Sequence, residues 1–296
     1  MVILGIGDNM TIKQLLKIIY EFIKDMGTVI TPIVAAVSFA CLYNPWHKIL
    51  EPYFITITIT TLIVSFIFSI LKRLYLKCRN EFKVKFNNPN FEVEVKYGDL
   101  FKEKSNIVIG FNNYFDTQMP EVISPSSIQG LFEQLYYKDN IDKLNSEILN
   151  ALKRKKCQAI KNNTDKVNGK RLELPIGTTI TISNNNRKFF LTAYSKMSER
   201  CMAESNITYL TITLNELWDE IRNSGQCNEF AMPVLGSGLA RIPVGKMALL
   251  CLILLSFITS SKEQIISNKL TITLNKKDKK IYKLSDIEVF LKNLQG

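Results

Sequence analysis

Two stretches near the N-terminus of the chain contain no charged residue. Residues 28–43 read TVITPIVAAVSFACLY, and residues 52–71 read PYFITITITTLIVSFIFSIL. The second has the roughly 20 apolar residues that a helix needs to cross a bilayer core. The first extends from Gly27 to about Trp46 without a charge, and the connection between the two runs is too short for a folded domain. The pattern predicts a transmembrane helical hairpin over residues 27–76.

Two other interpretations fit parts of this pattern. Both runs would also suit buried core helices, and the Thr-Ile alternation over residues 55–60 would suit a strand. We favour the hairpin because strongly basic segments flank the runs, and because the second run continues apolar on both faces.

Positive charge lies outside the two runs. Lys13, Lys17 and Lys24 precede the first run, whereas the connection offers only Lys48, which Glu51 offsets. Six basic residues follow the second run: Lys72, Arg73, Lys77, Arg79, Lys83 and Lys85. By the positive-inside rule both ends of the hairpin face the cytoplasm. We therefore expect a multi-pass inner-membrane protein, with residues 77–90 as a basic linker.

The first 26 residues have helical periodicity. Ile12, Leu15, Leu16, Ile19 and Phe22 share one face of a helix whose opposite face is charged. Residues 1–26 are therefore expected to form an amphipathic helix, which could lie at the membrane surface or contact another chain. A simple helical lead-in to the first span fits the pattern equally well.

Beyond residue 90, short strands alternate with helices. The strands are expected at 91–97, 106–111, 178–183, 188–194, 229–235 and 270–274, and the helices at 126–160, 213–223, 243–260 and 285–294. The apolar run 247–258 is too short to span a bilayer, so we interpret it as a buried core helix. This alternation predicts a layered α/β domain with a mixed sheet.

Composition narrows the chemistry. The chain of 296 residues carries a net charge of +11, contains six cysteines without a CxxC spacing, and has one histidine, His47. We therefore expect no metal site, no disulfide framework and no histidine-based catalysis. Nucleic-acid binding is disfavoured, because at least six positive charges flank the second span and suit anionic lipid headgroups. The clusters Lys153–Lys156 and Lys276–Lys280 are expected to be solvated faces.

Two loops at strand ends are candidates for ligand binding, since ligands of α/β sheets bind where strands lead into helices. The first, residues 112–130, reads NNYFDTQMPEVISPSSIQG, and the second, residues 236–243, reads GSGLARIP. A Gly-Ser-Gly turn before a helix lets backbone N–H groups approach an anion closely. The turn completes neither GxGxxG nor a P-loop, and it would equally suit a tight turn without a ligand.

Three segments together resemble macro domains, which are ADP-ribose-binding proteins of three-layer α/β/α fold. VEVKYGDLF carries the Gly98-Asp99 pair, NIVIGFNN ends in Asn112 and Asn113, and AMPVLGSGLARIP supplies the glycine loop. The resemblance covers residues 91–296, and its glycine loop is the most specific part. It implies a macro-like domain with a mixed sheet behind the transmembrane hairpin.

The pattern GFNNYFDT…ISPSSIQG behind a hairpin is similar to the Macro-TM effectors of Thoeris anti-phage defence, and closest to the type II-like branch. This resemblance implies that a partner TIR enzyme makes an ADP-ribose-derived signal, such as an ADP-ribose–histidine conjugate. The macro domain would bind the signal, after which a homo-oligomer would form and disrupt the membrane. It implies a bound ligand without a cofactor.

The resemblance also implies roles for individual residues. Asp99 matches the aspartate that accepts from the adenine amino group, and Asn112 matches the asparagine at the distal ribose. Ser126, Ser127 and Gly130 match the first phosphate-binding turn. The second diphosphate loop and the remaining expected ligand contacts are Gly236, Ser237, Gly238 and Leu239, then Leu100, Asn113, Phe115, Asp116, Pro233 and Leu235. Asp99 would equally suit a turn-capping aspartate, and Ser126 a helix N-cap.

The chain departs from hydrolytic macro domains, which carry glycines soon after the asparagine. Here that stretch reads Tyr114, Phe115, Asp116 and Thr117. The departure favours binding without turnover, so no catalytic residue is assigned. The alternative is a membrane-anchored ADP-ribosyl hydrolase with Asp116 or Glu121 as base. Asp116 could instead meet a cationic or amine part of a modified ligand.

Overall fold

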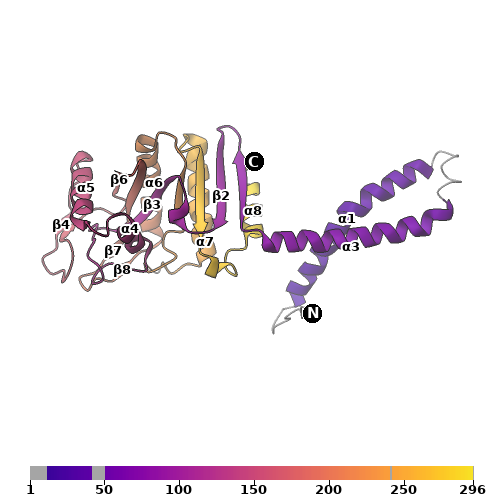
Figure 1. The fold of residues 1–296 in the computed structure, drawn as a ribbon, viewed down its shortest axis with the longest axis horizontal. Helices are drawn as coiled ribbons and strands as arrows, with labels where there is room; N and C mark the ends of the chain where they lie inside the picture. Colours follow the sequence, from indigo (N-terminus) through magenta and orange to yellow (C-terminus); the bar gives the residue numbers. More distant parts are fainter. Residues whose placement is uncertain (1–11, 42–50, 241, 296) are drawn as a thin grey trace. The chain divides into compact units, whose positions relative to one another are not determined.

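The computed structural model describes residues 12–41, 51–240 and 242–295. The chain divides into two compact units, Met1–Arg79 and Asn80–Gly296, each of which is described here by itself (Figure 1). Most of the connection between the two apolar runs, including His47, lies outside the described residues.

The described residues of the first unit form two long helices, α1 (Ile12–Cys41) and α3 (Phe54–Cys78). The short helix η1 (Glu51–Tyr53) directly precedes α3. The windows Phe22–Phe39 and Phe54–Tyr75 are long and apolar enough to cross a membrane, and the structure buries only 0% and 11% of them. The helices are therefore not the core of a folded domain. The Thr-Ile alternation lies within α3, so the strand interpretation is wrong.

The threonines of α3 fit a helix because their hydroxyls bond to its own backbone. Thr58 donates to the carbonyl of Phe54 at 2.9 Å, and Thr60 donates to that of Thr56 at 2.8 Å. Helix α1 continues through Gly27 without a break, so the expected amphipathic segment from Ile12 onward and the first apolar run form one helix.

Polar and aromatic contacts join α1 to α3. Asp25 on α1 forms an ion pair with Lys72 on α3, and Phe22 packs edge-on against Phe66 with ring centroids 5.5 Å apart. The guanidinium of Arg73 lies 5.2 Å from the centre of the Phe22 ring. Ion pairs at such positions are rare in apolar helices and fix helix pairing.

The second unit is built on an eight-stranded mixed sheet (Figure 1). Its strands are β1 (Glu81–Phe86), β2 (Phe91–Tyr97), β3 (Asn106–Asn112), β6 (Thr179–Asn184), β7 (Arg187–Met197), β8 (Ala203–Glu204), β9 (Phe230–Pro233) and β10 (Lys269–Leu274). The order is β1-β2-β10-β9-β3-β7-β6, with β8 added beside β7. The pairs from β2 to β7 are parallel, and β1 and β6 are antiparallel edge strands. A short pair, β4 (Lys161–Asn162) and β5 (Leu172–Glu173), lies apart from the sheet.

Helices cover the sheet in two groups. Helices α4 (Ile128–Tyr136) and α5 (Ile141–Arg154) pack on one hydrophobic cluster with β3, β6 and β7. Helices α6 (Ile207–Gly225), α7 (Lys246–Glu263) and α8 (Leu284–Asn293) form the other cluster with β1, β2, β9 and β10. The expected three-layer α/β/α arrangement is confirmed. Helix α7 holds the apolar run 247–258 in the core, as predicted, with Leu250, Ile253 and Phe257 fully buried.

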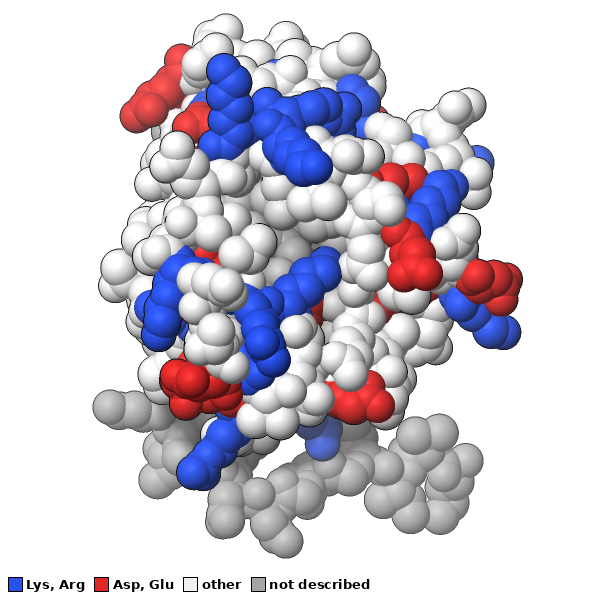
Figure 2. Space-filling model, turned by 90° about the vertical axis from the view of Figure 1, so that its left-hand side faces the viewer, with Lys and Arg blue, Asp and Glu red and all other residues white. Residues whose placement is uncertain are grey.

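The structure corrects two boundaries. Residues 77–90, expected as a basic linker, contain strand β1, in which Phe82, Val84 and Phe86 face the core between exposed charged residues. The expected helix over 126–160 is two helices, because Asn140 caps the start of α5 by accepting from the backbone N–H of Lys143. The basic residues Lys153–Lys156 at the end of α5 are exposed, and Figure 2 shows Lys and Arg side chains gathered on the face that carries this helix.

Candidate functional site

A cleft of about 900 Å³ lies where strands β2, β3, β9 and β10 end. Segments distant in the sequence line it: residues 97–102, 110–112, 122–124, 126–129, 131, 233–240, 273–276 and 278, with parts of β7. This edge is where parallel α/β sheets bind ligands, because loops and helix N-termini converge there. Both loops that the sequence singled out contribute to this cleft.

The glycine loop connects β9 to α7. Gly236 has a φ of +80°, and a Cβ there would lie 2.3 Å from Cδ1 of Ile242, so this turn requires glycine. Helix α7 begins at the capping position Gly245, which offers no side-chain acceptor. Its first N–H groups therefore have no side-chain partner and carry the positive end of the helix dipole. Pro233, Leu235, Gly236, Ser237, Gly238 and Leu239 all line the cleft, as expected from the sequence.

Asn112 ends β3 and is 3% exposed. Its Oδ1 accepts the backbone N–H of Tyr114 at 2.9 Å, which fixes the orientation of the amide. Its Nδ2 is buried and has no hydrogen-bond partner among the described residues, although Asn112 lines the cleft. A buried donor without a partner is destabilising unless a ligand oxygen satisfies it. The side chain is thus arranged to donate to a bound molecule.

Asp99 lines the cleft together with Leu100. Its Oδ1 accepts the backbone N–H of Phe101 at 3.0 Å, so it caps the short helix η2 (Leu100–Lys102). The capping interpretation is therefore confirmed. Because the cap uses Oδ1, Oδ2 is left for a ligand donor, and the two roles are compatible.

The turn that was expected to bind the first phosphate lies partly at the cleft. Ser126 and Ser127 line the cleft, whereas Gly130 does not. The helix N-cap that the sequence placed at Ser126 is Ser127, whose Oγ accepts the N–H of Gly130 at 2.9 Å. A Cβ at Gly130 would lie 2.3 Å from the carbonyl oxygen of Ser124. The absence of a side chain at Gly130 therefore lets the backbone at Ser124 pack closely against α4. We expected Gly130 to contact ligand, but its role is packing.

Three further residues that were expected to contact the ligand are absent from the described cleft lining: Asn113, Phe115 and Asp116. Asn113 Nδ2 donates to Glu173 at 3.1 Å, and its Oδ1 accepts the N–H of Met197 at 3.0 Å. Phe115 is fully buried and stacks on Phe111, with ring centroids 5.5 Å apart. The reason is the alternation of side chains at the end of β3, which directs Asn112 to the cleft and Asn113 away from it.

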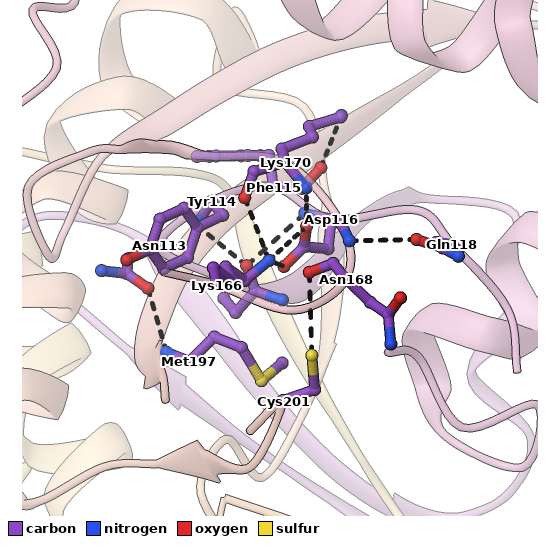
Figure 3. A network of polar contacts seen from close by, with 12 residues as sticks. Asn113, Tyr114, Phe115, Asp116, Gln118, Lys166, Asn168, Lys170, Met197 and Cys201 are labelled. Carbon is purple, nitrogen blue, oxygen red and sulfur yellow. Dashed lines mark hydrogen bonds and ion pairs between the residues drawn. The ribbon is translucent and has the colours of Figure 1, made fainter. Parts of the chain in front are cut away.

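Asp116 is also fully buried, which contradicts its expected role as a ligand contact. Lys166 Nζ lies 2.8 Å from its Oδ2, and the backbone N–H of Lys170 donates to its Oδ1 at 2.6 Å (Figure 3). Glu121, the other carboxylate considered as a base, is exposed and outside the described cleft lining. Neither carboxylate is placed to activate a water in the cleft.

Residues 163–173, which we call the strap, cover the 113–118 stretch (Figure 3). Gly169 has a φ of +84°, and a Cβ there would lie 2.2 Å from Asp116 Oδ1. Its N–H donates to Gln118 Oε1 at 3.0 Å, and Lys170 Nζ donates to the carbonyl of Phe115 at 2.6 Å. No sequence motif predicts the strap. The only local signal is the Asn-Gly turn at 168–169, which does not indicate what it packs against.

Two titratable groups are buried here, Glu133 under the strap and Lys170 within it. Burial raises the pKa of Glu133 on α4 to about 7, and its Oε1 accepts from Gln129 at 2.8 Å. Burial lowers the pKa of Lys170 to about 8. Gln129 also donates to the carbonyl of Asp116 at 2.6 Å and lines the cleft. The network under the strap is therefore continuous with the wall of the cleft.

Several lining residues come from strand ends and carry no motif: Tyr97, Tyr194, Ser195, Met197, Lys246, Lys276, Asp278 and Tyr282. Lys246 pairs with Asp278 at 2.9 Å beside the start of α7. These residues lie at or just beyond the carboxyl ends of strands, or at the start of α7. That position is the signal in the sequence by which they could have been predicted.

Comparison with known families agrees with this geometry. Residues 93–275 match the model of the Thoeris protein ThsA macro domain, and the match spans more than half of the chain. The chain belongs to this family. The matched range contains β3, the strap, the glycine loop and α7, so the residues of the cleft lie almost entirely within it.

Individual relatives extend the comparison. A Thoeris protein ThsA from Bacillus amyloliquefaciens (strain Y2) is 29% identical over 271 residues, covering 88% of this chain and 86% of that protein. The Oceanobacillus iheyensis macrodomain with ADP has a TM-score of 0.49 and 14% identity, covering 72% of this chain and 100% of that one. A variant of that macrodomain with ADPR has the same TM-score and identity, covering 71% of this chain.

Proposed function

We propose that this protein is a membrane effector of bacterial anti-phage defence whose macro domain binds an ADP-ribose-derived signal. The observation that carries the proposal is the cleft, whose lining includes the Gly236–Leu239 loop, the first residue of α7 and Asn112, with its free amide donor. A diphosphate suits the first two features, and a ribose hydroxyl suits the third.

The adenine end of the ligand is assigned to Asp99 and Leu100, which also line the cleft. Oδ2 of Asp99 would accept from the exocyclic amine of adenine, which selects adenine over bases that lack a donor there. Ser126 and Ser127 would support one phosphate together with the glycine loop. The ligand class is therefore an ADP-ribose derivative, such as the ADP-ribose–histidine conjugate, made by a partner TIR enzyme.

Binding without turnover fits the carboxylates of the site. The carboxylates among the described lining residues are Asp99 and Asp278. Asp99 caps η2 through Oδ1 and is assigned to adenine through Oδ2, and Asp278 pairs with Lys246. Asp116 is fully buried under the strap and pairs with Lys166. The proposal is therefore a sensor that is not an enzyme.

We assign the disruption of the membrane to helices α1 and α3. By the positive-inside rule the basic ends of both helices face the cytoplasm, with the macro domain on the same side of the inner membrane. Two helices do not enclose a pore, so we propose that ligand binding shifts the protein toward a homo-oligomer that disrupts the membrane.

The test is calorimetric titration of the full chain in detergent micelles with ADP-ribose and with its histidine conjugate. Gly236→Glu should abolish binding, because it adds bulk against Ile242 and negative charge where the diphosphate would lie. Val289→Glu is the matched control, because it adds the same carboxylate at an exposed position of α8 outside the described cleft lining. Circular dichroism establishes that each variant is folded. Absence of binding by the folded wild type would refute the sensor, and release of ADP-ribose from a modified protein would refute the absence of turnover.

A further inference from the structure

The pairing of β3 with β7 contains an irregularity at the cleft. Phe111 pairs with Ala193, and the next residue, Asn112, pairs with Ser195. Tyr194 is therefore the extra residue of a β-bulge directly beside Asn112. Bulges redirect a side chain and are over-represented next to functional sites. Here the bulge changes which side chains of β7 reach the cleft.

The ring of Tyr194 lies directly against Gly110 of β3. A Cβ at Gly110 would lie 2.5 Å from Cε1 and 2.8 Å from Cδ1 of the ring, and 3.0 Å from Cδ2 of Leu235. Glycine inside a strand weakens it, and often marks a close approach of another group. Gly110 thus leaves the space that the tyrosine ring occupies, beside the residue that precedes the glycine loop.

The hydroxyl of Tyr194 has no hydrogen-bond partner among the described residues, although the side chain is largely buried and lines the cleft. Burial raises the pKa of this phenol to about 12, so at neutral pH it is an uncharged donor. Its backbone is held separately, because Ser205 Oγ donates to the carbonyl of Tyr194 at 2.6 Å. The hydroxyl is therefore a free donor on a fixed ring.

We propose that the Tyr194 hydroxyl donates a hydrogen bond to a diphosphate oxygen of the bound nucleotide, with Gly110 as the residue that admits the ring. In the bulge Tyr194 adjoins Asn112, and beside Gly110 its ring lies with Leu235, the residue before the glycine loop. This inference rests on the proposed function, since it adds a contact from β7 to the two loops already assigned. It makes Tyr194 a residue that selects ligands carrying a diphosphate.

The opposing interpretation is that Tyr194 serves only packing, since its ring contacts the core cluster that contains α6 and α7. The two interpretations differ in what removal of the hydroxyl does. A ring that only packs keeps its contacts in Tyr194→Phe. A hydroxyl bonded to a phosphate oxygen is worth at least about tenfold in affinity, because bonds to charged groups are the stronger class.

The experiment titrates the full chain in detergent with ADP-ribose and with ADP, comparing wild type, Tyr194→Phe and Tyr209→Phe. Tyr209 is the matched control, because it lies in the first turn of α6 and outside the described cleft lining. We expect Tyr194→Phe to bind both ligands about tenfold more weakly, with an unchanged unfolding temperature. Tyr209→Phe should bind both ligands like the wild type.

A second pair of variants tests the role of Gly110. Gly110→Ala should weaken binding of both ligands, because the new methyl group must displace the Tyr194 ring. In a Tyr194→Ala background the ring is absent, so the same substitution should cost little further affinity. Equal losses in the two backgrounds would overturn the coupling of Gly110 to Tyr194.

The outcomes separate this inference from the proposed function. If the wild type binds ADP-ribose and Tyr194→Phe binds it equally well, the hydroxyl contact is refuted and the sensor stands. A loss confined to ADP-ribose, with ADP binding unchanged, would overturn the assignment to the diphosphate. If the folded wild type binds neither nucleotide, both the sensor and this inference fail.

Discussion

Replacing Lys166 with methionine tests how the strap is held. Lys166 and Asp116 are both 0% exposed, and Lys166 Nζ donates to both carboxylate oxygens of Asp116 and to the carbonyl of Lys170. Methionine has a similar length but donates nothing, so the substitution leaves a buried carboxylate without its cation. Breaking a buried ion pair in this way costs roughly 3–5 kcal/mol.

The structure places the expected loss at the lower end of that range. Asp116 keeps the 2.6 Å bond from the backbone N–H of Lys170, which supports part of its charge. The lysine also loses its approach to the Tyr114 ring, whose centre lies 4.5 Å from Nζ. We expect a loss of about 3 kcal/mol of unfolding free energy. For a domain of this size this corresponds to about 6–12 °C in melting temperature.

The assay is urea and thermal unfolding of the full chain in detergent, followed by the fluorescence of the buried Trp218. Lys161→Met is the matched control, because Lys161 is exposed in the short strand β4. The double variant Asp116→Asn/Lys166→Met removes both charges, and we expect it to recover part of the loss. A shift below about 2 °C for Lys166→Met would refute the reasoning, as would a double variant less stable than either single variant.

Four other predictions concern the cleft, the two buried titratable groups and the hairpin. Asn112→Asp should weaken ADP-ribose binding at least about tenfold in calorimetry, because an acceptor replaces the free donor; unchanged affinity would contradict the assignment. The folded-state pKa of Glu133, about 7, exceeds its ordinary 4.5, so the folded domain retains a proton that the unfolded chain releases. Urea unfolding should show stability falling from pH 4.5 to 7, with Glu133→Gln flattening this slope. The folded-state pKa of Lys170, about 8, lies below its ordinary 10.5, so stability should rise from pH 8 to 10.5, and a flat profile there would count against it. Lys72→Met should loosen the pairing of α1 with α3, measured as faster amide exchange in α1, and Asp25→Lys/Lys72→Asp should restore protection if the ion pair is the cause.

The sequence predicted most of the elements because their signals are local. Strands such as 106–111 and 270–274 carry continuous apolar or alternating patterns, and these segments are strands in the structure. Strand β1 was not predicted, because its alternating Phe82, Val84 and Phe86 lie in a segment that was interpreted as a basic linker from its positive charges. Charge at the exposed positions of an edge strand does not prevent pairing, since those side chains point to solvent.

The candidate site also has parts that local sequence predicts and parts that depend on long-range contacts. The glycine loop needed only its own residues to be recognised, because the turn at Gly236 and the start of α7 are set within ten residues. Whether the side chains of residues 113–116 reach the cleft depends on residues far along the chain. Asp116 is buried by Lys166, 50 residues away, and Asn113 is bonded to Glu173, 60 residues away.

The sequence by itself determined the order of the elements, the two apolar helices and the loops that form the two sides of the cleft. Only the tertiary structure decided which side chains face the cleft. Pattern and turn chemistry depend on neighbouring residues, whereas the orientation of Asn112, the sealing of Asp116 and the placement of Tyr194 depend on long-range pairing. A one-residue bulge and an 11-residue strap, with no motif of their own, set those orientations.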